Sequence, residues 1–196
     1  IRLLYSTGIR INEALYLLNK DVDFEKHAIL LRNTKNNRQR YAPINPSLEA
    51  VLRQYISYRN QITRYDVANP ENYFFISSLG KRCHKDEVAL WFQQALKIAG
   101  IPYKGQYLGP RVHDLRHTCC CHSLVKQINA GKDLYVCLPV LSKFMGHTEI
   151  IATERYLRLT QNMYPEIIKM DQSVTEEINQ LIKNSILLQN DEKCPE

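Results

Sequence analysis

The sequence predicts a mostly helical α+β domain that contains one small antiparallel β-sheet. Residues 21–45 alternate strand-like apolar positions with polar turn segments, a pattern typical of short antiparallel strands. Much of the chain that follows carries apolar residues at helical spacing, most clearly at positions 48, 51, 52, 55 and 56. At 196 residues the chain suits one domain with an appended tail. We therefore expect an α+β domain over residues 1–170 and a tail with an amphipathic helix over residues 171–196.

The N-terminal part is expected to start inside a helix, because Ile1, Leu3 and Leu4 precede turn residues at positions 6–8. The first residue is Ile rather than Met, so we interpret the chain as a fragment whose natural N-terminus lies further upstream. A second helix is predicted over residues 9–18. The sheet follows it, with strand-like residues at 22–24, 29–31 and 41–44 and a polar hairpin turn over 33–37.

Further helices are predicted in the second half of the chain, separated by turns that contain Gly and Pro. They cover residues 85–99, 113–128, 139–145 and 150–159, with a short aromatic strand at 73–76 and a loop over 101–110. The tail should form its own helix over residues 173–188, because Ser173 and Glu176 have the spacing of a capping box.

Charge and cysteine content favour an intracellular protein with a polyanionic partner. Lysine and arginine number 26 against 20 aspartate and glutamate residues, which gives a net charge of +6. This surplus suits DNA or RNA, although a solvated basic surface explains it as well. The six cysteines include three in a row at 119–121 and no C-x-x-C pair, so we expect no disulfide framework and a reducing cytoplasm. No run of about 18 apolar residues predicts a membrane span.

One cationic, imidazole-rich segment is a strong candidate for chemistry. His113, Arg116 and His117 have i, i+3, i+4 spacing, which places them on one face of the predicted helix. The N-terminus of a helix also offers backbone N–H groups that favour a bound phosphate. A planar guanidinium beside an imidazole could bind that phosphate and move a proton. The segment therefore favours phosphate chemistry.

The same residues have simpler interpretations when each is taken alone. His113 and His117 could bind zinc with the cysteines at 119–121 nearby, although adjacent cysteines on a helix point in divergent directions. The cluster of histidines and arginine could also be merely structural. Arg10 could form an ordinary surface ion pair with Glu13, three residues later.

Two further candidates are weak by themselves. Lys35 could be an ordinary charge on an exposed hairpin. Tyr156 is one of 12 tyrosines, and a single tyrosine is more typical of a packed position. His147 follows Gly146 and precedes Tyr156 by nine residues. The order and spacing of all these residues together therefore carry more information than any one of them.

In that order, the segments resemble the motifs of the tyrosine recombinase family, also called the phage integrase family. The resemblance covers roughly residues 1–160. Met145 replaces the leucine that usually precedes Gly-His, which conserves volume. Residues 7–15 resemble the family's first arginine motif, and Thr34-Lys35 with Arg40 and Pro43 resemble its lysine-bearing hairpin. Residues 113–118 resemble its second arginine motif. Met145-Gly146-His147, with Thr153 and Tyr156, match the spacing of its Gly-His…Tyr box.

The resemblance implies the integrase/recombinase catalytic-domain fold and a chemistry of DNA strand cleavage. It makes Tyr156 the nucleophile that attacks the scissile phosphate, forms a 3′-phosphotyrosyl bond and releases a 5′-hydroxyl. Arg10 and Arg116 would clamp the non-bridging oxygens of that phosphate, and His147 would donate a further hydrogen bond to it. His113 would act as the general base, and Lys35 would protonate the leaving oxygen.

The resemblance also implies the partners. Double-stranded DNA is the expected substrate and a homo-tetramer on DNA the expected assembly, with the tail helix as an element that neighbours could exchange. Glu13 and His117 are expected to orient the arginines or His113. No metal is expected, because side chains supply the cations. No small-molecule cofactor and no membrane partner are expected either.

The expected role is integration or excision of a mobile element by a bacterial, phage or element-encoded protein of the cytoplasm. Two other interpretations stay open, namely DNA relaxation of the type IB topoisomerase kind and a DNA-binding module without catalysis.

Overall fold

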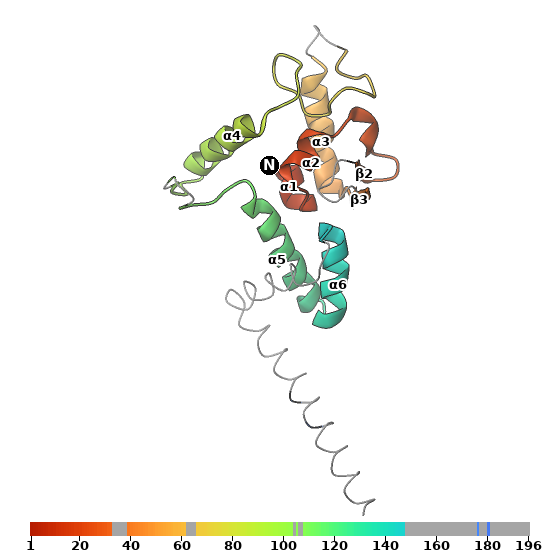
Figure 1. Cartoon of the computed structure of the whole chain (residues 1–196), viewed down its shortest axis with the longest axis vertical. Coiled ribbons are helices and arrows are strands. Elements are labelled where there is room, and N and C mark those ends of the chain that lie inside the picture. The colour runs from red at the N-terminus through yellow and green to blue at the C-terminus, as the bar shows by residue number, and fades with distance from the viewer. Residues whose placement is uncertain are drawn as a thin grey trace, which may run out of the picture.

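The computed structural model describes residues 1–32, 39–61, 66–103, 105, 108–147, 176 and 180. These residues form six α-helices and one small sheet (Figure 1). The first three helices and the sheet form one group, and α5 and α6 form a helical hairpin below it in Figure 1. None of the described helices is long and apolar enough to cross a membrane. The predicted α+β class with a small antiparallel sheet is confirmed.

The sheet has three antiparallel strands in the order β1 (Val22–Asp23), β2 (Ala28–Leu31) and β3 (Arg40–Pro43). Strand β2 pairs with both neighbours, and Ile29 lies opposite Ala42 on β3. Side chains alternate between the two faces of a strand, so Ile29, Leu31 and Ala42 are buried while Tyr41 is exposed. This alternation packs one face of the sheet into the core.

Helices α1 (Arg2–Thr7) and α3 (Pro46–Arg59) contribute to the same core. Helix α3 begins at Pro46 because Asn45 caps it, with Oδ1 accepting the backbone N–H of Leu48 at 2.8 Å. It therefore extends beyond the predicted 48–56 at both ends. The buried apolar residues of this core include Leu3, Leu4, Ile29, Leu31, Leu48, Leu52 and Phe74.

Helix α2 (Ile11–Leu15) is shorter than the predicted 9–18. The chain leaves the helix because the carbonyl of Leu17 accepts the N–H of Phe74 at 2.8 Å and Leu18 forms a β-bridge with Tyr73. A short 3-10 helix, η1 (Asn19–Asp21), follows. Long-range pairing thus replaces the last turn of the predicted helix. The expected strand at 73–76 is reduced to this bridge and a second one between Ile76 and Arg82.

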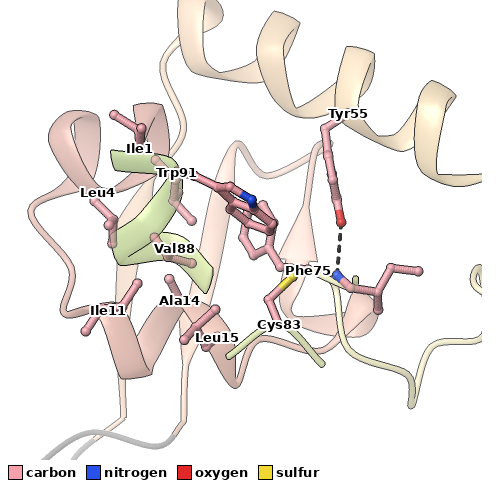
Figure 2. A pocket seen from close by; sticks show the side chains of 12 residues that line it. Ile1, Leu4, Ile11, Ala14, Leu15, Tyr55, Phe75, Cys83, Val88 and Trp91 are labelled. Carbon is pink, nitrogen blue, oxygen red and sulfur yellow. Dashed lines mark hydrogen bonds between the residues drawn. The ribbon is translucent and has the colours of Figure 1, made fainter. Parts of the chain in front are cut away.

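Helix α4 (Lys85–Ile98) packs against α2 and leaves a cavity of about 330 Å³ between them (Figure 2). Figure 2 shows Ile11 and Ala14 of α2 opposite Val88 and Trp91 of α4. At the other side of the cavity, the hydroxyl of Tyr55 accepts the backbone N–H of Ile76 at 3.0 Å. The cavity is therefore mostly apolar.

Helices α5 (Asp114–Asn129) and α6 (Leu134–Met145) form a second core. Helix α6 begins at Leu134 rather than at the predicted residue 139, because Asp133 accepts the backbone N–H groups of Tyr135 and Val136. Pro139 lies inside the helix, where packing of Cys137, Leu138 and Leu141 against α5 offsets its missing N–H. The cysteines at 119–121 are buried and free, and Cys120 and Cys121 pack in this second core.

Two predicted helices lie outside the described residues, wholly or in large part. The structure does not describe residues 150–159, and of the tail helix over 173–188 it describes only Glu176 and Gln180, which are helical and exposed. The division of the chain into a domain over 1–170 and a tail over 171–196 therefore stays a prediction.

Replacement of Gly8 by Ala should destabilise the fold more than replacement of Gly100. Both glycines have positive φ, +62° and +69°, so Ala costs about 1–2 kcal/mol of backbone strain at either position. A Cβ at Gly8 would also lie 2.8 Å from Sδ of the fully buried Met145, whereas at Gly100 it meets nothing within 4 Å. We expect Gly8→Ala to lower the free energy of unfolding by a further ~1–3 kcal/mol in urea denaturation. Equal losses in the two variants would contradict this close packing.

Candidate functional site

A buried carboxylate at the beginning of α2 lies between two arginines. Glu13 has a side chain that is 2% exposed, and its Oε2 accepts the backbone N–H of Arg10 at 2.8 Å. Arg10 donates from Nη1 to Oε1 at 3.0 Å, and Arg40 donates from Nη1 to Oε1 at 2.9 Å and from Nη2 to Oε2 at 2.8 Å. Burial raises the pKa of Glu13, but hydrogen bonds from Arg40 and from the Arg10 backbone outweigh it, so the pKa is lowered overall. The carboxylate is therefore charged at neutral pH.

A second buried arginine contact joins the ends of two helices. Arg116, in the first turn of α5, is 3% exposed and donates to the backbone carbonyls of Gly8 and Met145, the latter at 2.6 Å. Gly8 ends α1, and Met145 is the last residue of α6. Each of these carbonyls precedes a predicted site residue by two positions, Arg10 in one case and His147 in the other. Arg116 therefore fixes the two chain segments that carry those residues.

His147 lies where the charges of the site converge. Its backbone N–H donates to the carbonyl of Ser142 at 3.0 Å, which closes the end of α6. Burial has the largest effect on the pKa of His147, followed by the guanidinium groups of Arg116, Arg10 and Arg40 in that order, and together they lower this pKa to about 4. These three cations therefore lie close enough to His147 to act on its ring, which is neutral at pH 7.

His113 and His117 complete this region from α5. Their rings pack edge to face with centroids 4.9 Å apart. Burial lowers the pKa of both, and the neighbouring His117 and Arg116 lower that of His113 further. Arg111 and Asp114 form an ion pair of 3.0 Å at the start of the same helix, so the Asp114 carboxylate is partly compensated there. Both imidazoles are therefore predominantly neutral and able to accept a proton at pH 7.

Arg40 is the residue of the site that sequence analysis did not select. The sequence placed it only downstream of the lysine in the hairpin motif. In the structure it is the first residue of β3, its side chain is 15% exposed, and it lies against Gly146. A Cβ on Gly146 would lie 2.9 Å from Cζ and Nε of Arg40. The signal that could have identified it is strand alternation, because Arg40 shares the inward face of β3 with the buried Ala42.

The structure gathers most of the predicted site residues in one place. Arg10 contacts Glu13, and His113 contacts His117. Arg10 and His117 both lower the pKa of His147, and Arg116 lowers the pKa of all three histidines. Lys35 and Tyr156 lie outside the described residues. The catalytic roles assigned to all these residues stay predictions.

The described part of the chain offers no alternative metal centre. Among residues 1–32, 39–61, 66–103, 105 and 108–147, no group of three or more His, Cys, Asp or Glu side chains is arranged to hold a metal ion. The cations of this site are guanidinium groups, and these are well suited to a phosphate or carboxylate because of their planar, fork-like donors. The arrangement can therefore bind an anion beside two neutral imidazoles.

Comparisons with known proteins agree with this arrangement. The model of the phage integrase family matches residues 1–163. The putative integrase/recombinase y4rB of Sinorhizobium fredii is 33% identical over 167 residues, which make up 85% of this chain and 52% of that protein. The tyrosine recombinase XerC of Roseiflexus castenholzii is 34% identical over 160 residues, which make up 81% of this chain and 46% of that protein. The chain thus spans about half the length of these relatives.

Solved structures share the fold. The XerA recombinase is 22% identical with a TM-score of 0.62, and the match covers 83% of this chain and 54% of that chain. The XerH site-specific recombinase bound to its difH substrate is 21% identical with a TM-score of 0.60, and the match covers 79% of this chain and 40% of that chain. The integrase of transposon Tn1549 in complex with circular intermediate DNA is 25% identical with a TM-score of 0.58, and the match covers 78% of this chain and 50% of that chain. The predicted integrase/recombinase catalytic-domain fold is confirmed.

Neutralising Glu13 should destabilise the protein in a pH-dependent way. Because the folded-state pKa of Glu13 is lowered from 4.5, its contribution to stability is complete above that pH and is lost as the pH falls through the folded value. We expect Glu13→Gln to cost about 3 kcal/mol of unfolding free energy at pH 7, since it leaves buried arginine charge uncompensated. The measurement is urea denaturation at several pH values. The deficit should shrink below pH 4.5.

The matched control is Glu25→Gln, which changes an exposed glutamate in the turn between β1 and β2. The unfolding free energy of this variant should stay close to that of the unmodified protein at every pH. A Glu13→Gln deficit that is the same at acid and neutral pH would contradict the lowered pKa of Glu13.

The ring of His147 should titrate far below an ordinary histidine in the folded protein. We expect a pKa near 4, against about 6.5 for an unperturbed imidazole, because burial and three guanidinium groups oppose protonation. The test is an NMR titration of the imidazole resonances, with His147→Gln used to assign the signal. Since the unfolded chain binds this proton more tightly, His147 should also reduce stability as the pH falls from about 6.5 towards 4. A His147 ring that titrates near pH 6.5 in the folded protein would contradict its burial beside three guanidinium groups.

Proposed function

The chain belongs to the phage integrase family, and from this premise we propose that it carries the catalytic domain of a site-specific DNA recombinase. In this proposal the domain cleaves one DNA strand through a covalent 3′-phosphotyrosyl bond to Tyr156 and then rejoins it to a new partner. The observation that carries the proposal is a cluster of three arginines beside His147. Arg10 and Arg40 share the Glu13 carboxylate, and Arg40 and Arg116 contact the residues just before His147, whose pKa all three lower. Such a site suits a phosphodiester, whose negative charge increases in the transition state of the transfer.

The proposed division of roles follows from exposure and charge. The Arg10 side chain is 25% exposed, so a ligand can reach it, whereas Arg116 is buried and bound to two carbonyls. Both would stabilise charge on the non-bridging oxygens, Arg10 by contact and Arg116 at the base of the site. His147, being neutral, would add a hydrogen bond to the same phosphate without adding a charge to the free protein.

Proton transfer is assigned to other residues of the proposed site. A tyrosine with an ordinary pKa near ~10 is a weak nucleophile at neutral pH and needs a base or a positive environment. His113 is the proposed base, because its pKa is lowered and the ring can accept the proton of Tyr156. Lys35 is the proposed acid that protonates the leaving 5′ oxygen. No ATP is required, since the phosphotyrosyl bond conserves the energy of the bond that is broken.

Double-stranded DNA is the proposed substrate. The chain has a surplus of six positive charges, and related structures of XerH and of the Tn1549 integrase contain DNA. We also propose a homo-tetramer on DNA, with the tail over residues 171–196 as an element that neighbours exchange. Integration or excision of a mobile element is the proposed role, which the names of the y4rB and Tn1549 proteins support.

Cleavage should depend on Tyr156 and not on another tyrosine close to it in sequence. The test incubates the longest natural chain that contains residues 1–196 with a nicked duplex of its target site, so that a cleaved strand cannot be rejoined. We expect a covalent protein–DNA adduct that is lost in Tyr156→Phe, because only the phenolic oxygen can attack phosphorus. The control Tyr164→Phe should form the adduct at the unmodified rate. The adduct is measured as a shifted band in a denaturing gel.

Three results would contradict the proposal. An adduct that persists in Tyr156→Phe would remove the proposed nucleophile. DNA binding without any adduct would favour a module that only binds DNA. Relaxation of supercoils without strand exchange between two duplexes would favour a topoisomerase over a recombinase.

A further inference from the structure

We infer that Arg40 is a positioning residue, which shares the carboxylate of Glu13 with Arg10 and so keeps Arg10 directed towards the phosphate. The inference rests on the proposed function, because it concerns how the same site binds a phosphodiester. Arg40 comes from β3, whereas Arg10 and Glu13 belong to the beginning of α2. The sheet thus contributes a cation that the α2 segment does not supply by itself.

The hydrogen bonds of Glu13 are evenly divided between the two arginines. Each carboxylate oxygen accepts one donor from Arg10 and one from Arg40, all at 2.8–3.0 Å. A carboxylate has about four acceptor positions, so these four bonds saturate it. Arg10 therefore binds Glu13 with one guanidinium nitrogen and its backbone N–H, and does not form a two-pronged ion pair with it.

Removal of Arg40 would change the balance of charge around Arg10. Two guanidinium groups and one carboxylate leave one positive charge in excess, whereas Arg10 and Glu13 alone leave none. With two acceptor positions vacated, the carboxylate would draw the Arg10 guanidinium into a bidentate pair. That movement would take away the donors and the charge that the proposed phosphate needs.

Arg40 acts through this contact and does not itself reach a ligand. Both of its Nη atoms are bound to Glu13, and its Nε is buried with no hydrogen-bond partner in the described part of the chain. The backbone of Gly146 covers the guanidinium so closely that a Cβ there would lie 2.9 Å from Cζ. Arg40 is therefore held from two sides, by Glu13 and by the turn that carries His147.

The neighbouring strand provides a matched control. Arg32 follows the end of β2 and donates from Nε to Oδ1 of Asp21 at 2.5 Å. Asp21 is 2% exposed and also accepts the backbone N–H of Leu18, so this pair resembles that of Arg40 and Glu13. Arg32 does not contribute to the lowered pKa of His147. Loss of Arg32 therefore removes an arginine from another buried carboxylate, with one hydrogen bond in place of two and with 40% side-chain exposure against 15% for Arg40, and leaves the groups around His147 in place.

The test compares Arg40→Met, Arg40→Lys and Arg32→Met in the full natural chain, with folding checked by circular dichroism. Single-turnover adduct formation on the nicked duplex should be about 100-fold slower in Arg40→Met, because a displaced catalytic group typically costs that much. Arg32→Met should stay within a few-fold of the unmodified rate. Arg40→Lys should also be slow, since an ammonium keeps the charge but not the two-pronged geometry.

A second readout distinguishes positioning from general damage. By NMR, the pKa of His147 should rise in Arg40→Met, which removes a nearby positive charge, and stay low in Arg40→Lys and Arg32→Met. The Nε–H resonance of Arg10 should move in both Arg40 variants and not in Arg32→Met. These measurements need no DNA, so they report on Arg40 even if the proposed function is wrong.

The outcomes separate the two proposals. If the unmodified protein forms no adduct, the proposed function fails, and an unchanged Arg10 resonance in Arg40→Met would then overturn the role of Arg40 as well. If the unmodified protein forms the adduct and Arg40→Met forms it as fast as Arg32→Met, the inference about Arg40 fails alone. If Arg40→Met does not fold, Arg40→Lys decides, and an unmodified cleavage rate in that variant would overturn the inference.

Discussion

The carboxylate of Glu13 is the interaction on which the rest of the site depends. It is almost completely buried, which makes its charge costly unless that charge is well compensated. Four donors from Arg10 and Arg40 provide this compensation, and in return the carboxylate fixes both guanidinium groups. A single buried negative charge therefore allows two positive charges to stay close together, where they would otherwise repel each other. It also joins α2 to β3, so the site and the sheet are stabilised by the same contact.

Arg116 imposes a second constraint on the same region. Two backbone carbonyls accept hydrogen bonds from its guanidinium group, so peptide dipoles help to compensate its charge. The carbonyls come from the ends of α1 and α6, which have to approach closely. Gly8 and Gly146 permit this approach, since both have positive φ and would clash with Met145 and Arg40 if they carried a Cβ. Core packing, helix ends and cationic groups are thus parts of one arrangement.

Much of this arrangement could be predicted from the sequence, for identifiable reasons. The small sheet and the helices have strong periodicity, and the spacing of His113, Arg116 and His117 places them on one face of α5. The resemblance in motif order then brought Arg10 and His147 to the same site. The ends of α2 and α6 were predicted less well, because a β-bridge at Leu18 and the cap at Asp133 depend on partners that periodicity does not reveal.

Arg40 illustrates the limit of sequence analysis in the site itself. A single arginine in a strand is usually a solvated charge, and nothing in its spacing connects it with Glu13, which lies 27 residues earlier. Its role becomes visible only when strand pairing turns it inward against Gly146. The histidines show the same limit in another way. Their residue type suggests proton transfer, whereas their protonation state depends on burial and on neighbouring cations such as Arg116.

Arg10, Arg116 and His147 are proposed to form one anion site, in which Glu13 and Arg40 hold Arg10 in place. The most direct test is a titration of the isotope-labelled protein with inorganic phosphate, followed through the imidazole resonances of His147 and the Nε–H resonance of Arg10. We expect both signals to move together and to saturate at the same phosphate concentration. In Arg10→Gln, the His147 signal should no longer respond to phosphate. Signals that stay unchanged, or that move at unrelated concentrations, would show that these side chains do not bind a common phosphate.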